Sequence, residues 1–223
     1  MEYAEIARAE SERGELVLRE RRPEHGPSSL ELRANGVFVM DTLEVATERA
    51  LATAALAAVE APVAVIVGGL GLGFTMHEVL ADSRVEKIAV VEVEQALVDW
   101  MRDGTVPHGP ALLADERVTV VVADIAVALA EAPPGSYDLL LLDVDNGPGY
   151  LVHEANAAIY RTPFLTNARA ALRAGGAIAI WSASQTPELE RTLSEVFTSV
   201  EEHGYDVALQ ERDEKYWLYV ART

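Results

Sequence analysis

The stretch Val63-Ala-Val-Ile-Val-Gly-Gly-Leu-Gly-Leu-Gly-Phe-Thr-Met-His-Glu-Val-Leu80 decides how this chain folds. It begins with β-branched residues typical of a buried strand, continues with alternating glycines, and ends with apolar residues at helical spacing. Gly69, Gly71 and Gly73 let the backbone turn sharply and approach a ligand, while the first amides of the helix face the same space. The pattern predicts a strand, turn and helix that hold a nucleotide or nucleoside, although tight packing alone also produces such turns.

Each of the three strands that we expect after this turn has an acidic residue at its end. The strands cover residues 87–94, 117–124 and 137–143, and the carboxylates are Glu92, Asp124 and Asp143. Glu92 lies 21 residues beyond Gly71, about the interval at which a strand-end carboxylate accepts hydrogen bonds from ribose, although a solvated strand end fits as well. Because parallel strands end at one edge, we expect Glu92 at the ribose, Asp124 near an adenine amino group and Asp143 at the reacting centre.

The rest of the chain predicts a doubly wound, mostly parallel α/β sheet with a closing antiparallel hairpin. We expect a charged helix over residues 1–13 and a small antiparallel element over 14–41, with a hairpin at Asn35-Gly36. Further helices are predicted at 42–60, 95–102, 125–131, 154–173 (capped by Gly175-Gly176) and 187–198, and further strands at 177–181, 201–209 and 216–221, the last two joined by a charged turn. A boundary near Pro62 divides an N-terminal helix and β-hairpin element, 1–61, from an adenosyl-binding domain, 62–223.

Composition limits the classes of partner. A length of 223 residues suits one core, and the net charge of −18 predicts repulsion of nucleic acid and of anionic membranes. The absence of cysteine excludes disulfides and thiolate metal sites, and no apolar run is long enough to span a bilayer or resembles a secretory signal. We expect a cytoplasmic protein that acts on a polycationic or neutral small molecule, although solubility alone also explains the acidity.

Several segments together resemble the spermidine synthase family of polyamine aminopropyltransferases. These segments are Gly68-Gly-Leu-Gly-Leu-Gly73, Val91-Glu-Val-Glu94, Ala123-Asp124, Tyr137-Asp-Leu-Leu-Leu-Leu-Asp143 and Ala171-Leu-Arg-Ala-Gly-Gly176, and the likeness runs from about residue 14 to the C-terminus. The resemblance implies the Rossmann-like fold of class I methyltransferases and a homodimer. It also implies decarboxylated S-adenosylmethionine as donor of an aminopropyl group to an amine. By position, Glu92 would hold the ribose, Asp124 the adenine, and Asp143 would accept a proton from the attacking amine.

The chain departs from that family at the end of the pocket where the amine reacts. Gly71 stands where the family has an aspartate that helps bind the amine end of the donor. After the fourth strand the family reads Asp-Ser-Ser-Asp-Pro, whereas this chain reads Asp143-Val-Asp-Asn-Gly-Pro148, so that Asn146 replaces the second carboxylate and Asp145 lies beside it.

The positions expected to contact the acceptor also differ. The family lines its polyamine tunnel with a glutamine and a Tyr-His-Glu, where this chain has Val39 and Glu48-Arg49-Ala50. We expect an arginine at this place to oppose an ammonium tail. Asp145, Asn146, Tyr150 and His153 are the remaining candidates for contact with the acceptor.

Two other functions fit the same pattern. A methyltransferase would use intact S-adenosylmethionine, with Asp143 or His153 as general base. The segment 142–150 also resembles catechol-type O-methyltransferases, which bind magnesium there, but the Asp-Asn that those enzymes place after the next strand is Trp181-Ser-Ala-Ser184 here, so we expect no metal. The third alternative is a nucleoside-binding protein that keeps the fold without the reaction.

Overall fold

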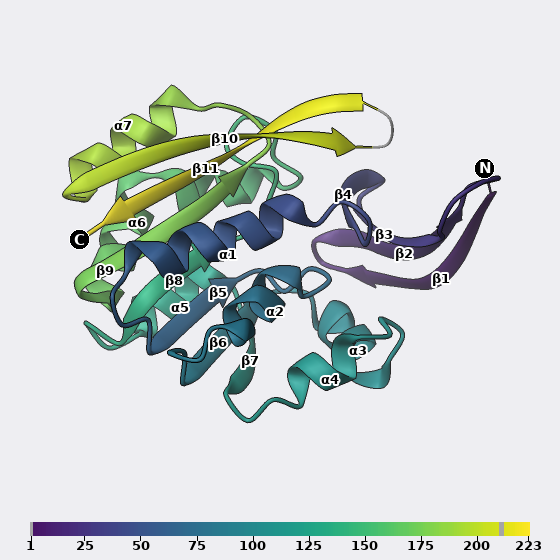
Figure 1. The fold of residues 1–223 in the computed structure, drawn as a ribbon, viewed down its shortest axis with the longest axis horizontal. Helices are drawn as coiled ribbons and strands as arrows, with labels where there is room; N and C mark the ends of the chain where they lie inside the picture. The colour runs from purple at the N-terminus through teal and green to yellow at the C-terminus, as the bar shows by residue number, and fades with distance from the viewer. Residues whose placement is uncertain (1, 210–211) are drawn as a thin grey trace.

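The computed structural model describes residues 2–209 and 212–223, in which a seven-stranded sheet carries helices on both faces and a four-stranded sheet extends from one end (Figure 1). The large sheet contains β5 (Ala64–Gly68), β6 (Lys87–Glu92), β7 (Val118–Val122), β8 (Tyr137–Leu142), β9 (Leu172–Ser182), β10 (Ser199–Leu209) and β11 (Arg212–Arg222). Their order is β10-β11-β9-β8-β5-β6-β7, and only the pairs that involve β11 are antiparallel. The predicted fold class is therefore confirmed, while part of the charged turn, residues 210–211, lies outside the described residues.

Successive side chains of each strand point to opposite faces of the large sheet, and helices cover both faces. The helices are α1 (Ala46–Ala58), α2 (Phe74–Ala81), α3 (Gln95–Asp103), α4 (Gly109–Leu113), α5 (Ile125–Glu131), a 3-10 helix η1 (Glu154–Tyr160), α6 (Thr162–Ala171) and α7 (Pro187–Val196). Leu139 and Leu141 share one core with α1, α2 and α3, whereas Leu140 and Leu142 share a second core with α5, α6 and α7. The continuous apolar run of β8 follows from this burial on both faces.

The N-terminal sheet is built by β1 (Glu2–Ser11), β2 (Gly14–Arg22), β3 (Ser29–Ala34) and β4 (Val37–Asp41), in that order and all antiparallel. The hairpin predicted at Asn35-Gly36 is confirmed, because these two residues join β3 to β4 with φ of 52° and 76°. Two successive positive φ values match the twist of the flanking strands and favour Asn-Gly.

The helix predicted over residues 1–13 is wrong, because these residues contain the strand β1. Its half-buried side chains are Ala4, Ala7 and Ala9, and the pairing with β2 shifts register between Glu5 and Ala7. A bulge adds one residue to a strand, which changes the regular alternation of its side chains. The resulting spacing of three and then two residues hides the period of the strand.

Two further predictions near the C-terminal half need correction. Residues 154–173 do not form one helix: η1 ends before Arg161, whose extended backbone (φ −104°, ψ 157°) separates it from α6. Pro163 explains the break, because proline is tolerated in the first turn of a helix and not in its interior. Gly175 and Gly176 lie inside β9 instead of capping a helix, and a Cβ on Gly176 would stand 2.9 Å from two backbone oxygens.

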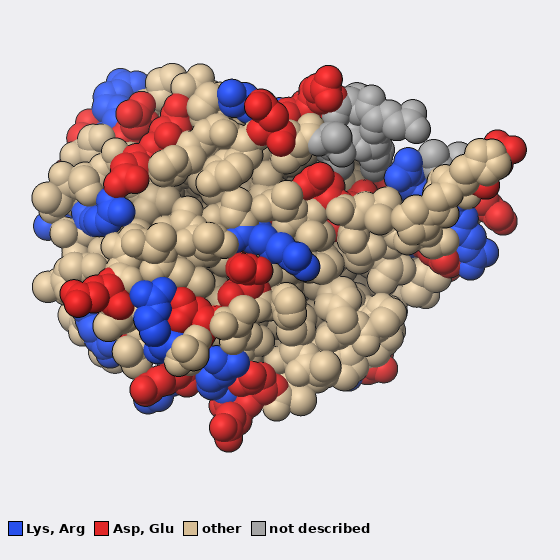
Figure 2. All heavy atoms as spheres, viewed as in Figure 1, with Lys and Arg blue, Asp and Glu red and all other residues tan. Residues whose placement is uncertain are grey.

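The N-terminal sheet packs on the core of the large sheet. Leu18, Leu32 and Met40 belong to the same buried cluster as α2 and α3, and α1 packs against α2 and β9. The boundary near Pro62 stays a prediction. No helix within the described ranges is both long and apolar enough to cross a membrane. On the face in Figure 2, acidic and basic side chains lie interspersed.

Candidate active site

The glycine turn brings the ends of three strands together. The Gly69 amide donates to the Val91 carbonyl at 2.9 Å, and the Asp143 amide donates to the Gly68 carbonyl at 2.9 Å. Gly69 has φ of +93°, and a Cβ there would overlap the carbonyl oxygen of Asp143. Only glycine therefore lets the end of β5 approach the ends of β6 and β8 so closely.

A pocket opens at these strand ends, beneath the N-terminal sheet. It is lined by Gly69, Gly71, Glu92, Asp124, Asp143, Asp145, Asn146 and His153 among the predicted site residues. Gly73 does not line it: this residue precedes α2 with φ of +86° and packs beside Met101. Tyr150 is also outside the lining and 60 % exposed. The structure thus brings together all three strand-end carboxylates and separates Tyr150 from them.

The carboxylate of Glu92 is fixed by two backbone amides. Its Oε2 accepts from the Leu70 amide and its Oε1 from the Glu94 amide, both at 2.8 Å. Burial raises the pKa of Glu92, while these amides act in the opposite direction. Asp124 caps α5 by accepting from the Ala126 amide at 2.7 Å, and its side chain is otherwise exposed. Each carboxylate keeps acceptor capacity for a ligand in the pocket.

Asp143 lies half-buried in the pocket and interacts with Glu48 of α1. The Thr75 hydroxyl, on the first turn of α2, donates to Asp143 Oδ2 at 2.7 Å. Burial raises the pKa of Asp143, and the bond from Thr75 partly offsets this. Burial, followed by the nearby charge of Asp143, raises the pKa of Glu48 to about 8.

Of the residues that match the tunnel-lining positions of the family, Glu48 lines the pocket and Arg49 does not. Glu48 lines the pocket and is 8 % exposed, whereas the Arg49 side chain is exposed to solvent and outside the lining. The expectation that an arginine opposes an ammonium group here is therefore wrong. The available signal was helical spacing, because Glu48 shares the buried face of α1 with Leu51, Ala52 and Ala55.

Asp145 organises the loop that follows β8. Its Oδ1 accepts from the amides of Asn146 and Val152 at 2.7 and 2.8 Å, and its Oδ2 accepts from the Asn156 side chain at 2.7 Å. The residue is 9 % exposed. These bonds hold the segment that carries Asn146 and His153 against the pocket.

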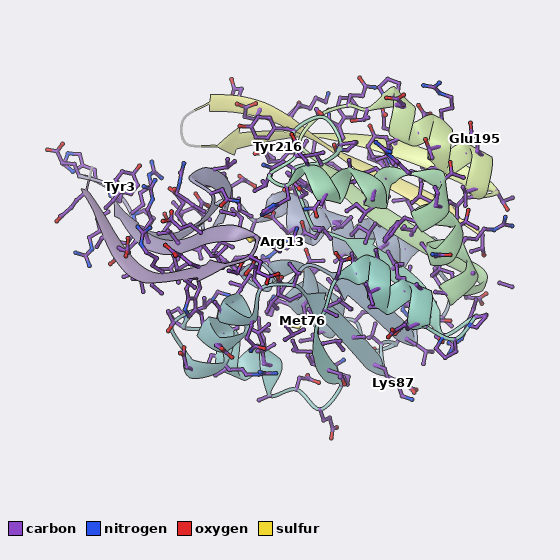
Figure 3. The ribbon with its side chains drawn as sticks, turned by 180° about the vertical axis from the view of Figure 1, so that it is seen from behind. Tyr3, Arg13, Met76, Lys87, Glu195 and Tyr216 are labelled. Atoms are coloured by element: carbon purple, nitrogen blue, oxygen red, sulfur yellow. The ribbon has the colours of Figure 1, made fainter. Side chains whose placement is uncertain are left out.

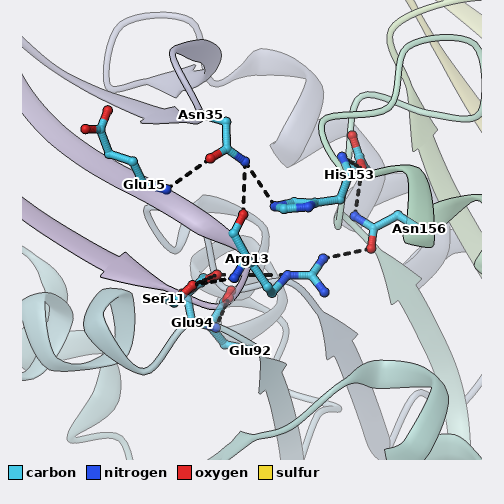
Figure 4. Close-up of polar contacts among 9 residues, drawn as sticks. Ser11, Arg13, Glu15, Asn35, Glu92, Glu94, His153 and Asn156 are labelled. Atoms are coloured by element: carbon cyan, nitrogen blue, oxygen red, sulfur yellow. Dashed lines mark hydrogen bonds and ion pairs between the residues drawn. The ribbon is translucent and has the colours of Figure 1, made fainter.

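The turns at the pocket end of the N-terminal sheet make polar contacts with the loops around the pocket, and the sequence did not reveal these contacts (Figure 4). Arg13, in the turn between β1 and β2, donates to Asn156 Oδ1 at 2.9 Å and lies 3.9 Å from the Glu94 carboxylate. Asn35 contacts the His153 ring at 3.2 Å. Figure 3 shows Arg13 at the junction of the two sheets and Tyr3 at the distant tip. These contacts connect residues more than 80 positions apart, which no local pattern encodes.

Comparisons with known proteins show the family to which the chain belongs. The model of the spermine/spermidine synthase domain matches residues 44–213. Putrescine N-methyltransferase 3 of Nicotiana tabacum is 33% identical over 125 residues, which are 55% of this chain and 31% of that protein. Polyamine aminopropyltransferase 2 of Pseudomonas aeruginosa is 30% identical over 162 residues, 68% of this chain and 44% of that protein. The chain therefore spans less than half the length of these two relatives.

Solved structures of other proteins share the fold of this chain. Spermidine synthase from Thermotoga maritima superposes with a TM-score of 0.82 at 18% identity, over 98% of this chain and 72% of that one. The superposition shows a shared fold, and the family model covers most of the chain independently of it. The chain therefore belongs to the spermine/spermidine synthase family.

Proposed function

We propose that this protein is a transferase that binds decarboxylated S-adenosylmethionine and transfers its aminopropyl group to an amine. The observation that carries the proposal is the convergence of Glu92, Asp124 and Asp143 on one pocket beside the glycine turn. Membership of the spermine/spermidine synthase family supports the same activity. A polyamine is the proposed acceptor.

In this proposal the donor is held by side chains and backbone groups of the pocket. The Glu92 carboxylate, oriented by the amides of Leu70 and Glu94, accepts hydrogen bonds from the ribose hydroxyls. Asp124 uses Oδ1 to cap α5 and offers Oδ2 to the adenine amino group. The turn at Gly69 and Gly71 lets the backbone lie close to the donor. No metal takes part in this scheme.

Asp143 acts as the general base. The lone pair of the acceptor nitrogen attacks the aminopropyl carbon bonded to the sulfonium. A C–N bond forms, the C–S bond breaks, and its electron pair stays on sulfur, which leaves neutral methylthioadenosine. Asp143 accepts the proton that the nitrogen loses, and its burial keeps its pKa above the ordinary range, as suits a base working near neutral pH. Asn146 and His153 border the acceptor side.

Methyl transfer from intact S-adenosylmethionine is the second candidate. Gly71 favours it, because the position lacks the carboxylate that would repel the carboxylate of the intact donor. The tobacco relatives named putrescine N-methyltransferases point the same way. The two activities differ in the donor that is bound and in which carbon next to the sulfonium is attacked.

Incubation of the protein with putrescine and each donor separates these activities by mass spectrometry. We expect an aminopropylated amine and methylthioadenosine from the decarboxylated donor. A methylated amine with S-adenosylhomocysteine would establish the second candidate, and adenosyl binding without any product would refute both transfers. Asp143→Asn should lower turnover at least about 100-fold while methylthioadenosine binding changes little, because general bases contribute about 100- to 10,000-fold.

Assembly and location complete the proposal. A homodimer, as the family resemblance implies, and a cytoplasmic location are both predictions. Sedimentation at micromolar concentration tests the first, and cell fractionation tests the second. A monomer at all accessible concentrations would remove the dimer from the proposal.

A further inference from the structure

We propose that Glu48 binds the ammonium group of the donor's aminopropyl tail, and so replaces from α1 the carboxylate that position 71 lacks. The inference rests on the proposed function and adds to it a residue that selects a donor with a cationic tail. Its basis is a pair of carboxyl groups, those of the buried Glu48 and the half-buried Asp143, that come from different elements and line the same pocket.

Thr75 places the two acidic residues side by side. Its hydroxyl lies 2.7 Å from Asp143 Oδ2 and 3.4 Å from the backbone oxygen of Glu48. The neighbouring Thr47 hydroxyl donates to Glu48 Oε2 at 3.0 Å. Among the described residues, these are the side-chain hydrogen bonds to either carboxyl, so that Glu48 Oε1 and Asp143 Oδ1 each keep their acceptor capacity.

The pair lacks a countercharge within the part of the chain that the structure describes. The charged neighbours that act on Glu48 are the acidic residues Asp143 and Glu44, and no basic residue acts on Asp143. Two adjacent carboxylates are costly to ionise in a buried site, because each loses its hydration and repels the other. An ammonium group with its three donors supplies both the charge and the hydrogen bonds that the pair lacks.

Met40 occupies the place toward which a side chain at position 71 would extend. A Cβ on Gly71 would stand 2.7 Å from Met40 Sδ, and the Leu72 amide lies 3.2 Å from the same sulfur. Met40 also lines the pocket. The carboxylate absent at Gly71 is thus replaced by a thioether, while Glu48 on α1 restores an acidic group at the reacting end.

The pH dependence follows from the groups around Glu48. Burial, followed by the charges of Asp143 and Glu44, raises the pKa of Glu48. Burial, followed by the charges of Glu214, Glu48, Glu44 and Asp41, raises the pKa of Tyr216 of β11 to about 12. Glu48 therefore ionises near pH 8, whereas an alkylammonium keeps its proton to about pH 10. Preference for a cationic tail should strengthen between pH 7 and pH 9.

Calorimetry with two ligands whose sulfur is an uncharged thioether isolates the ammonium contact. Methylthioadenosine lacks the tail, and S-adenosyl-3-thiopropylamine carries it. We expect the amine to bind about 10- to 100-fold more tightly than methylthioadenosine, as a charge-assisted contact allows. In Glu48→Gln this ratio should fall about tenfold, with methylthioadenosine affinity within twofold of the wild type, and its rise between pH 7 and pH 9 should disappear.

Glu44→Gln is the matched control. It makes the same glutamate-to-glutamine change close to α1, but Glu44 does not line the pocket, and its carboxylate accepts a hydrogen bond from the Ala46 amide. We expect this variant to keep the wild-type ratio. A ratio unchanged in Glu48→Gln would overturn the inference while leaving adenosyl binding intact. Failure of the wild type to bind methylthioadenosine would instead overturn the proposed function, and the inference with it.

Discussion

Replacing Glu48 by glutamine should make the stability of the protein less dependent on pH. The pKa of this carboxyl is raised from its ordinary value of 4.5 to about 8, chiefly by burial. Below pH 4.5 the folded and unfolded chains both hold the proton. Between pH 4.5 and pH 8 only the folded chain holds it, so the free energy of unfolding falls as pH rises.

The magnitude is large compared with the stability of a domain. A pKa raised from 4.5 to about 8 corresponds to at most about 5 kcal/mol, at about 1.4 kcal/mol per pH unit. Glutamine keeps the shape of the side chain and cannot ionise, so the variant should lose much less stability across this range. Asp143 keeps a pH dependence of its own in the same direction, because burial raises its pKa as well.

Urea unfolding followed by circular dichroism between pH 5 and pH 8 measures this effect. We expect the wild type to lose stability steadily as pH rises and Glu48→Gln to follow a shallower slope. Glu44→Gln, which makes the same glutamate-to-glutamine change outside the pocket, should follow the wild type. Parallel slopes for the wild type and Glu48→Gln would refute the assignment of a buried, protonated carboxyl to this position.

Three further substitutions, and Gly36→Ala as a control, test other parts of the structure. Glu92→Gln should weaken methylthioadenosine binding about 10- to 100-fold in calorimetry, because a charge-assisted contact to ribose is lost; unchanged affinity would contradict the ribose assignment. Gly69→Ala should prevent stable folding, since its Cβ overlaps the Asp143 carbonyl, whereas Gly36→Ala, with nothing within 4 Å, should cost only about 1–2 kcal/mol in urea unfolding for its positive φ. Thr75→Val removes a hydrogen bond that lowers the pKa of Asp143, so the acidic limb of the pH–rate profile should move to higher pH.

Local patterns in the sequence predict most of the large sheet. The glycine turn and the apolar run of β8 each specify an element without help from distant residues. The same holds for Asn35-Gly36, because the turn requires positive φ values. Strand β1 was not predicted, because the bulge after Glu5 disturbs the alternation of its side chains. The break between η1 and α6 was not predicted either, because Pro163 divides a region that otherwise has helical composition.

Part of the candidate site was predictable from the topology of the sheet and not from local patterns. Parallel strands end at one edge, so topology alone brings Glu92, Asp124 and Asp143 together. Glu48 and Arg13 reach the pocket from α1 and from the N-terminal sheet, and their positions depend on how these elements pack against the large sheet. Such packing depends on contacts between residues far apart in the chain, and local sequence patterns do not specify these contacts.

Titration of the protein with methylthioadenosine tests the central claim most directly, because this ligand needs the adenosyl pocket and no acceptor. We predict saturable binding of one ligand per chain, weakened by Glu92→Gln and nearly unaffected by Asp143→Asn. No detectable heat up to millimolar ligand, for both methylthioadenosine and S-adenosylhomocysteine, would contradict an adenosyl site at the ends of β5, β6, β7 and β8.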